Sequence, residues 1–202
     1  IEIQGQTGLS KIAIGETLDN LINYVPKDKK TVIITDGNLK KYYQKQFPNW
    51  PIIETGTGEK NKTLETTEMI YRELVDLEMD RSCYIVGIGG GIVCDITGFA
   101  ASTYMRGVRF GFVSTTLLSQ VDASVGGKNG VNLDAYKNMV GVFCQPEFVI
   151  CDPEMVPLSG LVTLESGPDR TRIRSAVVYT ASRASATISS MVIRTAPVAM
   201  IR

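Results

Sequence analysis

The residues best suited to chemistry gather around the glycines of segment 83–99, CYIVGIGGGIVCDITGF. A β-branched run enters a glycine cluster that ends with Gly90 and Gly91, and a helical pattern follows. Glycines at such a junction let the backbone approach a ligand closely, and the free N–H groups of the helix start favour a phosphate. The sixth position of a G-x-G-x-x-G motif is Ile92 here, so a tight turn with nothing bound stays open as an alternative.

Polar groups stand at this junction and at two others. Asp95 lies one turn into the helix, where it either caps the helix or faces a cofactor amide. Thr115 and Thr116 follow a strand, and hydroxyls there either contact a ligand or cap the next helix. Segment 58–62 (GEKNK) is charged, which in isolation favours a solvated loop.

Segment 120–146 places charged and amide side chains among glycines. They are Asp122, Lys128, Lys137 and Asn138, around Gly126, Gly127 and Gly130. Two cations and an amide beside a glycine hinge predict an anion site for a phosphate or carboxylate. Charges scattered through glycine-rich, apolar sequence are poorly explained as a solvated face.

Composition narrows the function classes. The 202 residues are 44% hydrophobic, and Lys+Arg and Asp+Glu total 21 each. This balance indicates a globular protein and argues against nucleic acid or an anionic membrane as partner. No apolar run reaches membrane-spanning length and the first residues do not resemble a signal peptide, so we expect a cytoplasmic protein. The sequence has no histidine, which excludes catalysis by histidine and metal ligation by histidine in this chain.

The cysteines form no C-x-x-C pair. They are Cys83, Cys94, Cys144 and Cys151. At this length and density a disulfide scaffold is improbable, and we expect small buried hydrophobic residues in a reduced compartment.

The elements that must position these residues alternate between strands and helices. An opening hairpin is expected at Ile1–Gln4 and Lys11–Ile14, and a helix at Thr63–Leu77, with a second running from the glycine cluster through Ala101. Further strands are predicted at Thr31–Thr35, Pro51–Glu54, Cys83–Ile88, Arg109–Val113 and Phe148–Cys151. The alternation predicts the α/β class, a Rossmann-like parallel sheet with flanking helices.

A change in composition marks a boundary near residue 157. Residues 1–156 carry 15 basic and 19 acidic groups, whereas residues 157–202 carry six arginines, no lysine and two acids. We therefore expect an α/β domain over 1–156 and an atypical tail, rich in Arg, Ser, Thr and Ala, over 157–202.

Residues 1–156 closely resemble 3-dehydroquinate synthase, a family of sugar-phosphate cyclases. The shared motifs are GE-x-x-K at Gly58, GGG-x-x-x-D-x-x-GF at Gly89, Arg106-Gly107, TTLL-x-QVD-x-SVGGK-x-GVN at Thr115, KN-x-x-G at Lys137 and QP at Gln145. Other cyclases and iron-dependent alcohol dehydrogenases share the glycine loop, but they differ in the string from Thr115 to Asn138.

The resemblance implies an NAD-binding domain of a shikimate-pathway lyase. In this family NAD transiently oxidises a hydroxyl of a seven-carbon phosphorylated keto acid, so that phosphate is eliminated before the ring closes. The implied cofactor-binding residues are Asp36, Gly58, Glu59, Lys62, Gly90, Gly91, Asp95, Thr115, Thr116, Lys128 and Lys137. The implied catalytic residues are Asp122, Lys128 and Asn138, with Arg106 reaching the phosphate from a partner subunit of a homodimer.

The same resemblance implies a metal that this chain does not hold. The family's C-terminal helical domain supplies a Glu and two His to a divalent ion, zinc or cobalt. When the alignment with the family is extended without gaps, Arg170 falls at the position of the metal-binding Glu and Ile173 at that of a catalytic Lys. Neither residue can perform the role of the one it replaces. Our hypothesis is that residues from about 157 are not native family sequence, as a shifted reading frame would produce, and that the chain is incomplete and inactive alone. A divergent natural tail is the alternative.

Two other functions stay open. In the first, the chain is a non-catalytic nucleotide-binding module. In the second, it is a relative of the metal-dependent alcohol dehydrogenases. A simple nucleotide binder has no need of Asp122, Lys128 and Asn138 together, and a dehydrogenase of that type needs metal ligands that are missing here.

Overall fold

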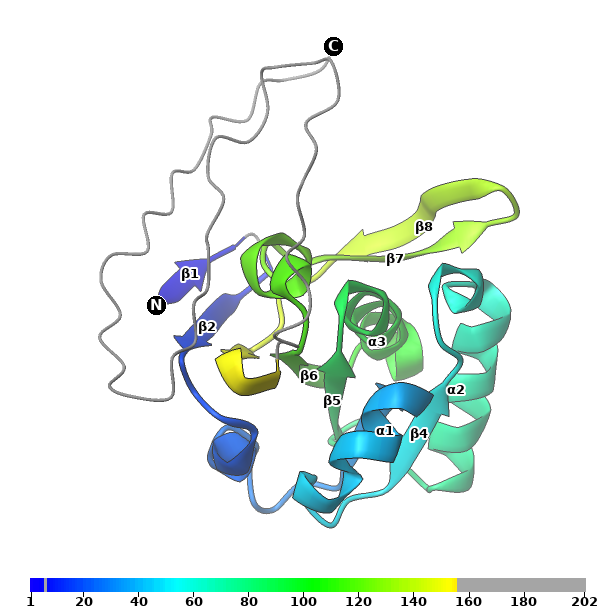
Figure 1. Ribbon diagram of the computed structural model, residues 1–202. Coiled ribbons are helices and arrows are strands. Elements are labelled where there is room, and N and C mark those ends of the chain that lie inside the picture. The colour runs from blue at the N-terminus through cyan, green and yellow to red at the C-terminus, as the bar shows by residue number, and fades with distance from the viewer. Residues whose placement is uncertain (6, 156–202) are drawn as a thin grey trace, which may run out of the picture. The chain divides into compact units, whose positions relative to one another are not determined.

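The computed structural model describes residues 1–5 and 7–155, and its centre is a seven-stranded sheet in the order β1-β2-β9-β6-β5-β3-β4 (Figure 1). β1 runs antiparallel to β2, and every other neighbouring pair is parallel. The strands are β1 (Glu2–Gln4), β2 (Leu9–Ile14), β3 (Thr31–Asp36), β4 (Ile52–Thr55), β5 (Tyr84–Gly89), β6 (Arg109–Ser114) and β9 (Phe148–Cys151). The predicted α/β class and each predicted strand are confirmed.

The central strands are continuous apolar runs because both faces of the sheet are covered. In β3, Val32 and Ile34 pack on one face and Ile33 on the other, and all three are fully buried. Side chains alternate along a strand, so a strand between two helical layers needs apolar residues at every position.

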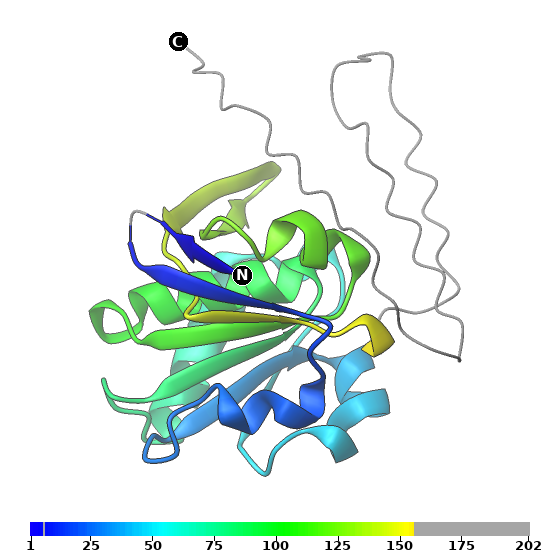
Figure 2. The ribbon, with the colours of Figure 1, turned by 90° about the vertical axis from the view of Figure 1, so that its left-hand side faces the viewer.

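Helices cover the two faces separately. α2 (Leu64–Asp76) and α3 (Gly91–Thr103) pack on one face, whereas the 3-10 helix η1 (Leu18–Asn23) and α1 (Gly37–Tyr43) pack on the other. Figure 2 shows the layers from the side, with η1 and α1 below the sheet and the β7–β8 hairpin above it. Shorter helical turns are η2 (Gln44–Gln46), η3 (Glu59–Asn61), η4 (Tyr104–Arg106), η5 (Ser119–Ala123) and η6 (Pro153–Met155).

Local capping explains where the helices begin. Thr63 precedes α2 and its hydroxyl accepts a hydrogen bond from the backbone N–H of Thr66 at 3.2 Å. Asp36 precedes α1 in the same way, accepting from the N–H groups of Asn38 and Leu39 at 2.9 and 3.1 Å. The helix at Thr63–Leu77 was predicted and is confirmed, whereas α1 was not predicted.

A two-stranded hairpin, β7 (Lys128–Leu133) with β8 (Tyr136–Phe143), packs on α3 and was also not predicted. Gly130 and Gly141 oppose each other, and a Cβ at Gly141 would lie 2.5 Å from the carbonyl oxygen of Asn129. The glycines of this segment therefore allow two strands to approach closely.

The strand order reverses between β3 and β5: β4 lies on one side of β3, whereas β5, β6 and β9 follow on the other. α1 follows β3 on one face and α3 follows β5 on the other. Such a switch point forms a crevice at the carboxyl ends of the strands. Ligands of open α/β sheets bind at such a point.

None of the described helices combines the length and the apolarity needed to cross a bilayer. The predicted tail at 157–202 lies outside the described residues.

Candidate ligand-binding site

The glycine cluster forms the start of α3 beside this crevice. Gly90 is the N-cap residue and makes no side-chain capping bond, so the first-turn N–H groups of α3 have no intrahelical partner. A Cβ at Gly90 would lie 3.0 Å from Cγ2 of Thr116. The loop therefore has an uncapped helix start and a closely packed backbone, which suits a phosphate.

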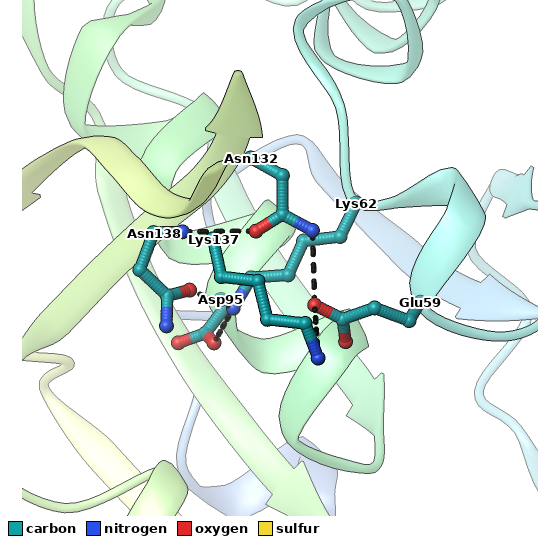
Figure 3. Close-up of polar contacts among 6 residues, drawn as sticks. All are labelled: Glu59, Lys62, Asp95, Asn132, Lys137 and Asn138. Carbon is teal, nitrogen blue, oxygen red and sulfur yellow. Dashed lines mark hydrogen bonds and ion pairs between the residues drawn. The ribbon is translucent and has the colours of Figure 1, made fainter. Parts of the chain in front are cut away.

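Lys62 connects the 58–62 loop to α3 and to the hairpin. Its Nζ donates to Oδ2 of Asp95 and to Oδ1 of Asn138, both at 2.5 Å (Figure 3). Lys62 is only 4% exposed, so the solvated-loop interpretation of segment 58–62 is wrong for this residue. A buried ammonium group needs such partners, because an unpaired one is strongly destabilising.

Asp95 is the partly buried carboxylate of this group. Burial raises the pKa of Asp95 above its ordinary value, and the Lys62 ammonium, which favours the charged form, offsets that effect only in part. Asp95 lies in the second turn of α3 and contacts Lys62 rather than the start of its own helix. The helix-capping alternative for Asp95 is therefore wrong.

Glu59 and Lys137 meet on the other side of the same loop. Oε1 of Glu59 accepts from Nδ2 of Asn132 at 2.9 Å and lies 4.0 Å from Nζ of Lys137. Oδ1 of Asn132 accepts from the backbone N–H of Asn138 at 2.9 Å. Figure 3 shows Asn132 between Glu59 and Asn138.

A pocket of about 430 Å³ lies beside Asp95, within the size range of small-molecule sites. Of its lining residues, the ones singled out from the sequence are Asp95, Asp122, Lys128 and Asn138. Lys128 forms no ion pair within the described part of the chain, so its ammonium group is available to an anion. The remaining lining comes from Val125, which follows η5, and from the hairpin, including the exposed side chains Met139 and Phe143.

Other predicted residues lie along the carboxyl edge but make local contacts. The Asp36 carboxylate caps α1, and the Thr116 hydroxyl accepts from the N–H of Ser119 at 3.3 Å, which is the capping alternative. Thr115 is buried, and its N–H donates to the carbonyl of Gly89 at 3.0 Å. Gly58 precedes η3 with φ +85°, a conformation that favours glycine.

Arg106 stands apart from all of these residues. It lies beyond the C-terminal end of α3, about 20 Å along that helix from Gly91, and it is exposed. Met105, Arg106 and Gly107 have consecutive positive φ values of 49, 71 and 111°. Arg106 therefore does not reach the pocket of its own chain.

The residues at the crevice fit a dinucleotide, whereas the described part of the chain holds no cluster of metal ligands. The uncapped start of α3, with Thr115, Lys62 and Asp95 beside it, offers donors and an acceptor to a phosphate and an amide. Within residues 1–5 and 7–155, no three His, Cys, Asp or Glu side chains come together as metal ligands. The positions of Arg170 and Ile173 lie outside the described residues.

Sequence reasoning missed Asn132 and Asn129 as individual residues. Asn132 is the last residue of the quoted motif SVGGK-x-GVN and Asn129 is its unspecified position, whereas the residues predicted from the motif were Thr115, Thr116, Asp122 and Lys128. Asn129 is 5% exposed, and its Nδ2 donates to the carbonyls of Gly127 and Cys144 at 3.0 and 2.8 Å. The available signal was an asparagine in a glycine-rich turn, directly before Gly130, because a buried amide there satisfies backbone groups that the turn leaves unpaired.

The strand order, the crevice and the glycine-capped helix define a doubly wound α/β domain of the nucleotide-binding type. Residues 52–165 match the model of the family described as 3-dehydroquinate synthase N-terminal, so the chain belongs to this family.

Similar proteins agree with the family match. The 3-dehydroquinate synthase of Clostridium botulinum is 43% identical over 157 residues, covering 73% of this chain and 43% of that protein. That of Acetivibrio thermocellus is 46% identical over 129 residues, covering 59% and 36%. A crystal structure of 2-deoxy-scyllo-inosose synthase with carbaglucose-6-phosphate, NAD+ and Co2+ is 29% identical with a TM-score of 0.69, covering 79% and 47%. The chain thus spans less than half the length of these relatives.

Proposed function

We propose that this chain is the NAD- and phosphate-binding part of a 3-dehydroquinate synthase, a lyase that converts a seven-carbon phosphorylated keto acid into 3-dehydroquinate. The observation that carries the proposal is the pocket in which Asp95, Asp122, Lys128 and Asn138 converge. Family membership supports it, as does the relative whose crystal contains NAD+ and a sugar-phosphate analogue.

Residues of the carboxyl edge would hold the cofactor. The N–H groups at Gly90 and Gly91 would bind the pyrophosphate, because they lie at an uncapped helix start. Asp36, Glu59 and Lys62 would contact the nucleoside parts, and Asp95, Thr115, Thr116 and Lys137 the remaining groups. Bound NAD supplies the transient oxidation of a substrate hydroxyl, which acidifies the neighbouring C–H bond.

Pocket residues would hold the phosphate end of the substrate. The Lys128 ammonium group has no carboxylate partner among the described residues, so it can pair with phosphate oxygens. Oδ1 of Asn138 accepts from Lys62, which leaves its Nδ2 group to donate to an anion. The Asp122 carboxylate, on the same lining, would accept from a substrate hydroxyl.

The proposal assigns binding, rather than a whole reaction, to these 202 residues. The chain has no histidine, so it does not supply the imidazole ligands of the family's metal, and no step here depends on that metal. Arg106, at the far end of α3 from its own pocket, would serve the site of a partner subunit in a homodimer. We expect the protein to act in the cytoplasm.

A nucleotide-binding module without catalysis is the competing function. It would need the crevice and α3, but it would not need a second pocket with a lysine beside them. The lining of the pocket by Asp122, Lys128 and Asn138 therefore favours the synthase.

Calorimetric titration of the 202-residue chain with NAD tests the proposal. We expect saturable binding that Lys62→Ala and Asp95→Ala each weaken about tenfold or more, because each removes a charged hydrogen-bonding partner. Lys60→Ala is the matched control: it removes an exposed lysine two positions away in the same loop and should leave the affinity unchanged. A folded chain that gives no heat with NAD would refute the cofactor assignment.

A further inference from the structure

β8 contains a bulge opposite Asn132. Val131 pairs with Val140 and Leu133 pairs with Tyr136, so one residue of β7 faces three residues of β8, at positions 137–139. A bulge leaves backbone groups without ladder partners and turns side chains in new directions. Here it presents Lys137 towards Glu59 and Asn138 towards Lys62.

Asn132 occupies the gap that this bulge creates. Its Oδ1 accepts the N–H of Asn138 at 2.9 Å, and its Nδ2 donates to Glu59 at 2.9 Å. Its own N–H donates to the carbonyl of Lys62 at 2.8 Å, next to a parallel bridge between Asn132 and Thr63. One residue thus joins the 58–62 loop to the β8 bulge by three hydrogen bonds.

We propose that Asn132 is a positioning residue that couples the cofactor loop to the phosphate pocket. It fixes the bulge so that Asn138 faces the pocket, and it fixes the Glu59 carboxylate in the loop. The nature of the two ligands, NAD and phosphate, rests on the function proposed above. The coupling itself rests only on the contacts of Asn132.

The backbone of Asn138 explains why such support is needed. Its φ of +55° lies in the left-handed region, which is uncommon for residues other than glycine, although asparagine adopts it more readily than most. The bond from the Asn138 N–H to Asn132 restrains this conformation. Without it, we expect the bulge to sample other conformations, and Asn138 and Lys137 to lose their common orientation.

Two substitutions separate the two ends of the Asn132 amide. Asn132→Ala removes both side-chain bonds. Asn132→Asp keeps an oxygen for the N–H of Asn138 but cannot donate to Glu59, and it places two carboxylates together. The double variant Asn132→Asp, Glu59→Gln restores a hydrogen bond between positions 59 and 132. Its direction is reversed, because the glutamine amide donates and the aspartate accepts.

The first measurement needs no ligand. Amide hydrogen exchange, read by NMR on the full 202-residue chain, should be at least about tenfold faster at Asn138 in Asn132→Ala, and close to wild type in Asn132→Asp. A general loss of stability would instead speed exchange at hairpin amides such as Val131 and Val140 in both variants. Equal protection of Asn138 in wild type and Asn132→Ala would overturn the proposal.

The second measurement is the NAD affinity of the same variants. We expect Asn132→Ala and Asn132→Asp each to weaken NAD binding about tenfold, and we expect Asn132→Asp to cost little once Glu59→Gln is present. Additive losses in the double variant would contradict the coupling through Glu59. If the wild-type chain binds no NAD, the proposed function fails, while the exchange of Asn138 still decides the role of Asn132.

Discussion

The ion pair of Lys62 and Asp95 is subject to two opposing effects, the loss of hydration of both charges and their mutual attraction. The two side chains are 6% and 21% exposed, so each charge has lost most of its hydration. Their attraction compensates for that loss only in part, as the raised pKa of Asp95 indicates. Binding sites commonly retain such strained charges, because a ligand that supplies a better partner gains affinity from them.

The stability of the chain should therefore respond to acid in a way particular to Asp95. An Asp whose pKa is raised in the folded state, above its ordinary 3.8, contributes stability that is present at low pH and is lost as the pH rises through the raised pKa. Compared with Asp95→Asn, the wild type should thus gain unfolding free energy as the pH falls from about 7 to about 3. Urea unfolding of both proteins across this range measures the difference.

Asp80 provides a control of opposite sign. Hydrogen bonds from the hydroxyl and the N–H of Ser82, both at 2.7 Å, lower the pKa of Asp80. The contribution of Asp80 to stability is present above pH 3.8 and is lost at lower pH. The wild type should therefore lose free energy of unfolding relative to Asp80→Asn in acid. The same direction of change for both aspartates would contradict the assignment of burial as the cause at Asp95.

At the scale of elements, the contact between α3 and β7 determines where the pocket beside Asp95 lies. A Cβ at Gly98 would overlap Oδ1 of Asn129, so the helix admits the buried amide only because residue 98 is glycine. That amide in turn holds the carbonyls of Gly127 and Cys144, at the base of the hairpin. The small residue on the helix and the amide on the strand form one unit.

Gly98→Ala should destabilise the fold by about 1–3 kcal/mol, although alanine is the better helix former by about 1 kcal/mol. The added methyl group displaces Asn129 and leaves two buried carbonyls without donors. In an Asn129→Ala background the same substitution should cost less, because the overlaps with Oδ1 and Cγ of Asn129 are gone and only the contact with Cβ, at 3.0 Å, is left. Urea unfolding of the four proteins gives the coupling energy, and additive effects would contradict a direct contact.

The elements differ in how far the sequence predicts them. The strands β3 and β5 are unbroken apolar runs, and α2 repeats its apolar residues at helical spacing, so local pattern alone identifies them. The hairpin was missed because glycines and polar residues interrupt the alternation of its strands, which are stabilised by packing on α3. For the site, the motifs predicted which residues gather at the pocket, but the pairing of Lys62 with both Asp95 and Asn138 depends on a contact between distant segments.

At the scale of the molecule, the burial of three cysteine thiols makes their reactivity a measure of the integrity of the whole described fold. Cys83, Cys94 and Cys151 are buried, as predicted, whereas Cys144 is partly exposed. Burial raises the pKa of Cys83 and of Cys151 to about 11, and it also raises the pKa of Cys94. These three thiols belong to different parts of one core, next to β5, in α3 and in β9.

A thiol reagent at about pH 8 should therefore modify one cysteine quickly, Cys144, and the other three slowly and at a common rate, because they become accessible only when the core opens. Mass spectrometry of timed samples measures the order, and Cys144→Ser should remove the fast phase. Rapid modification of Cys94 or Cys151 in the native protein would show that the sheet opens locally.

The position of β2 in the sheet has a consequence for synthesis. Ile12 of β2 pairs with Val149 of β9, so the N-terminal strand joins the sheet through residues made almost at the end of the described chain. At ribosomal speeds of roughly 5–20 residues per second, the emerging strand waits about 7–30 seconds for its partner. During that interval β3 and β5 can pair without it, and the β1–β2 hairpin of the nascent chain has one edge without a partner, which a chaperone can hold.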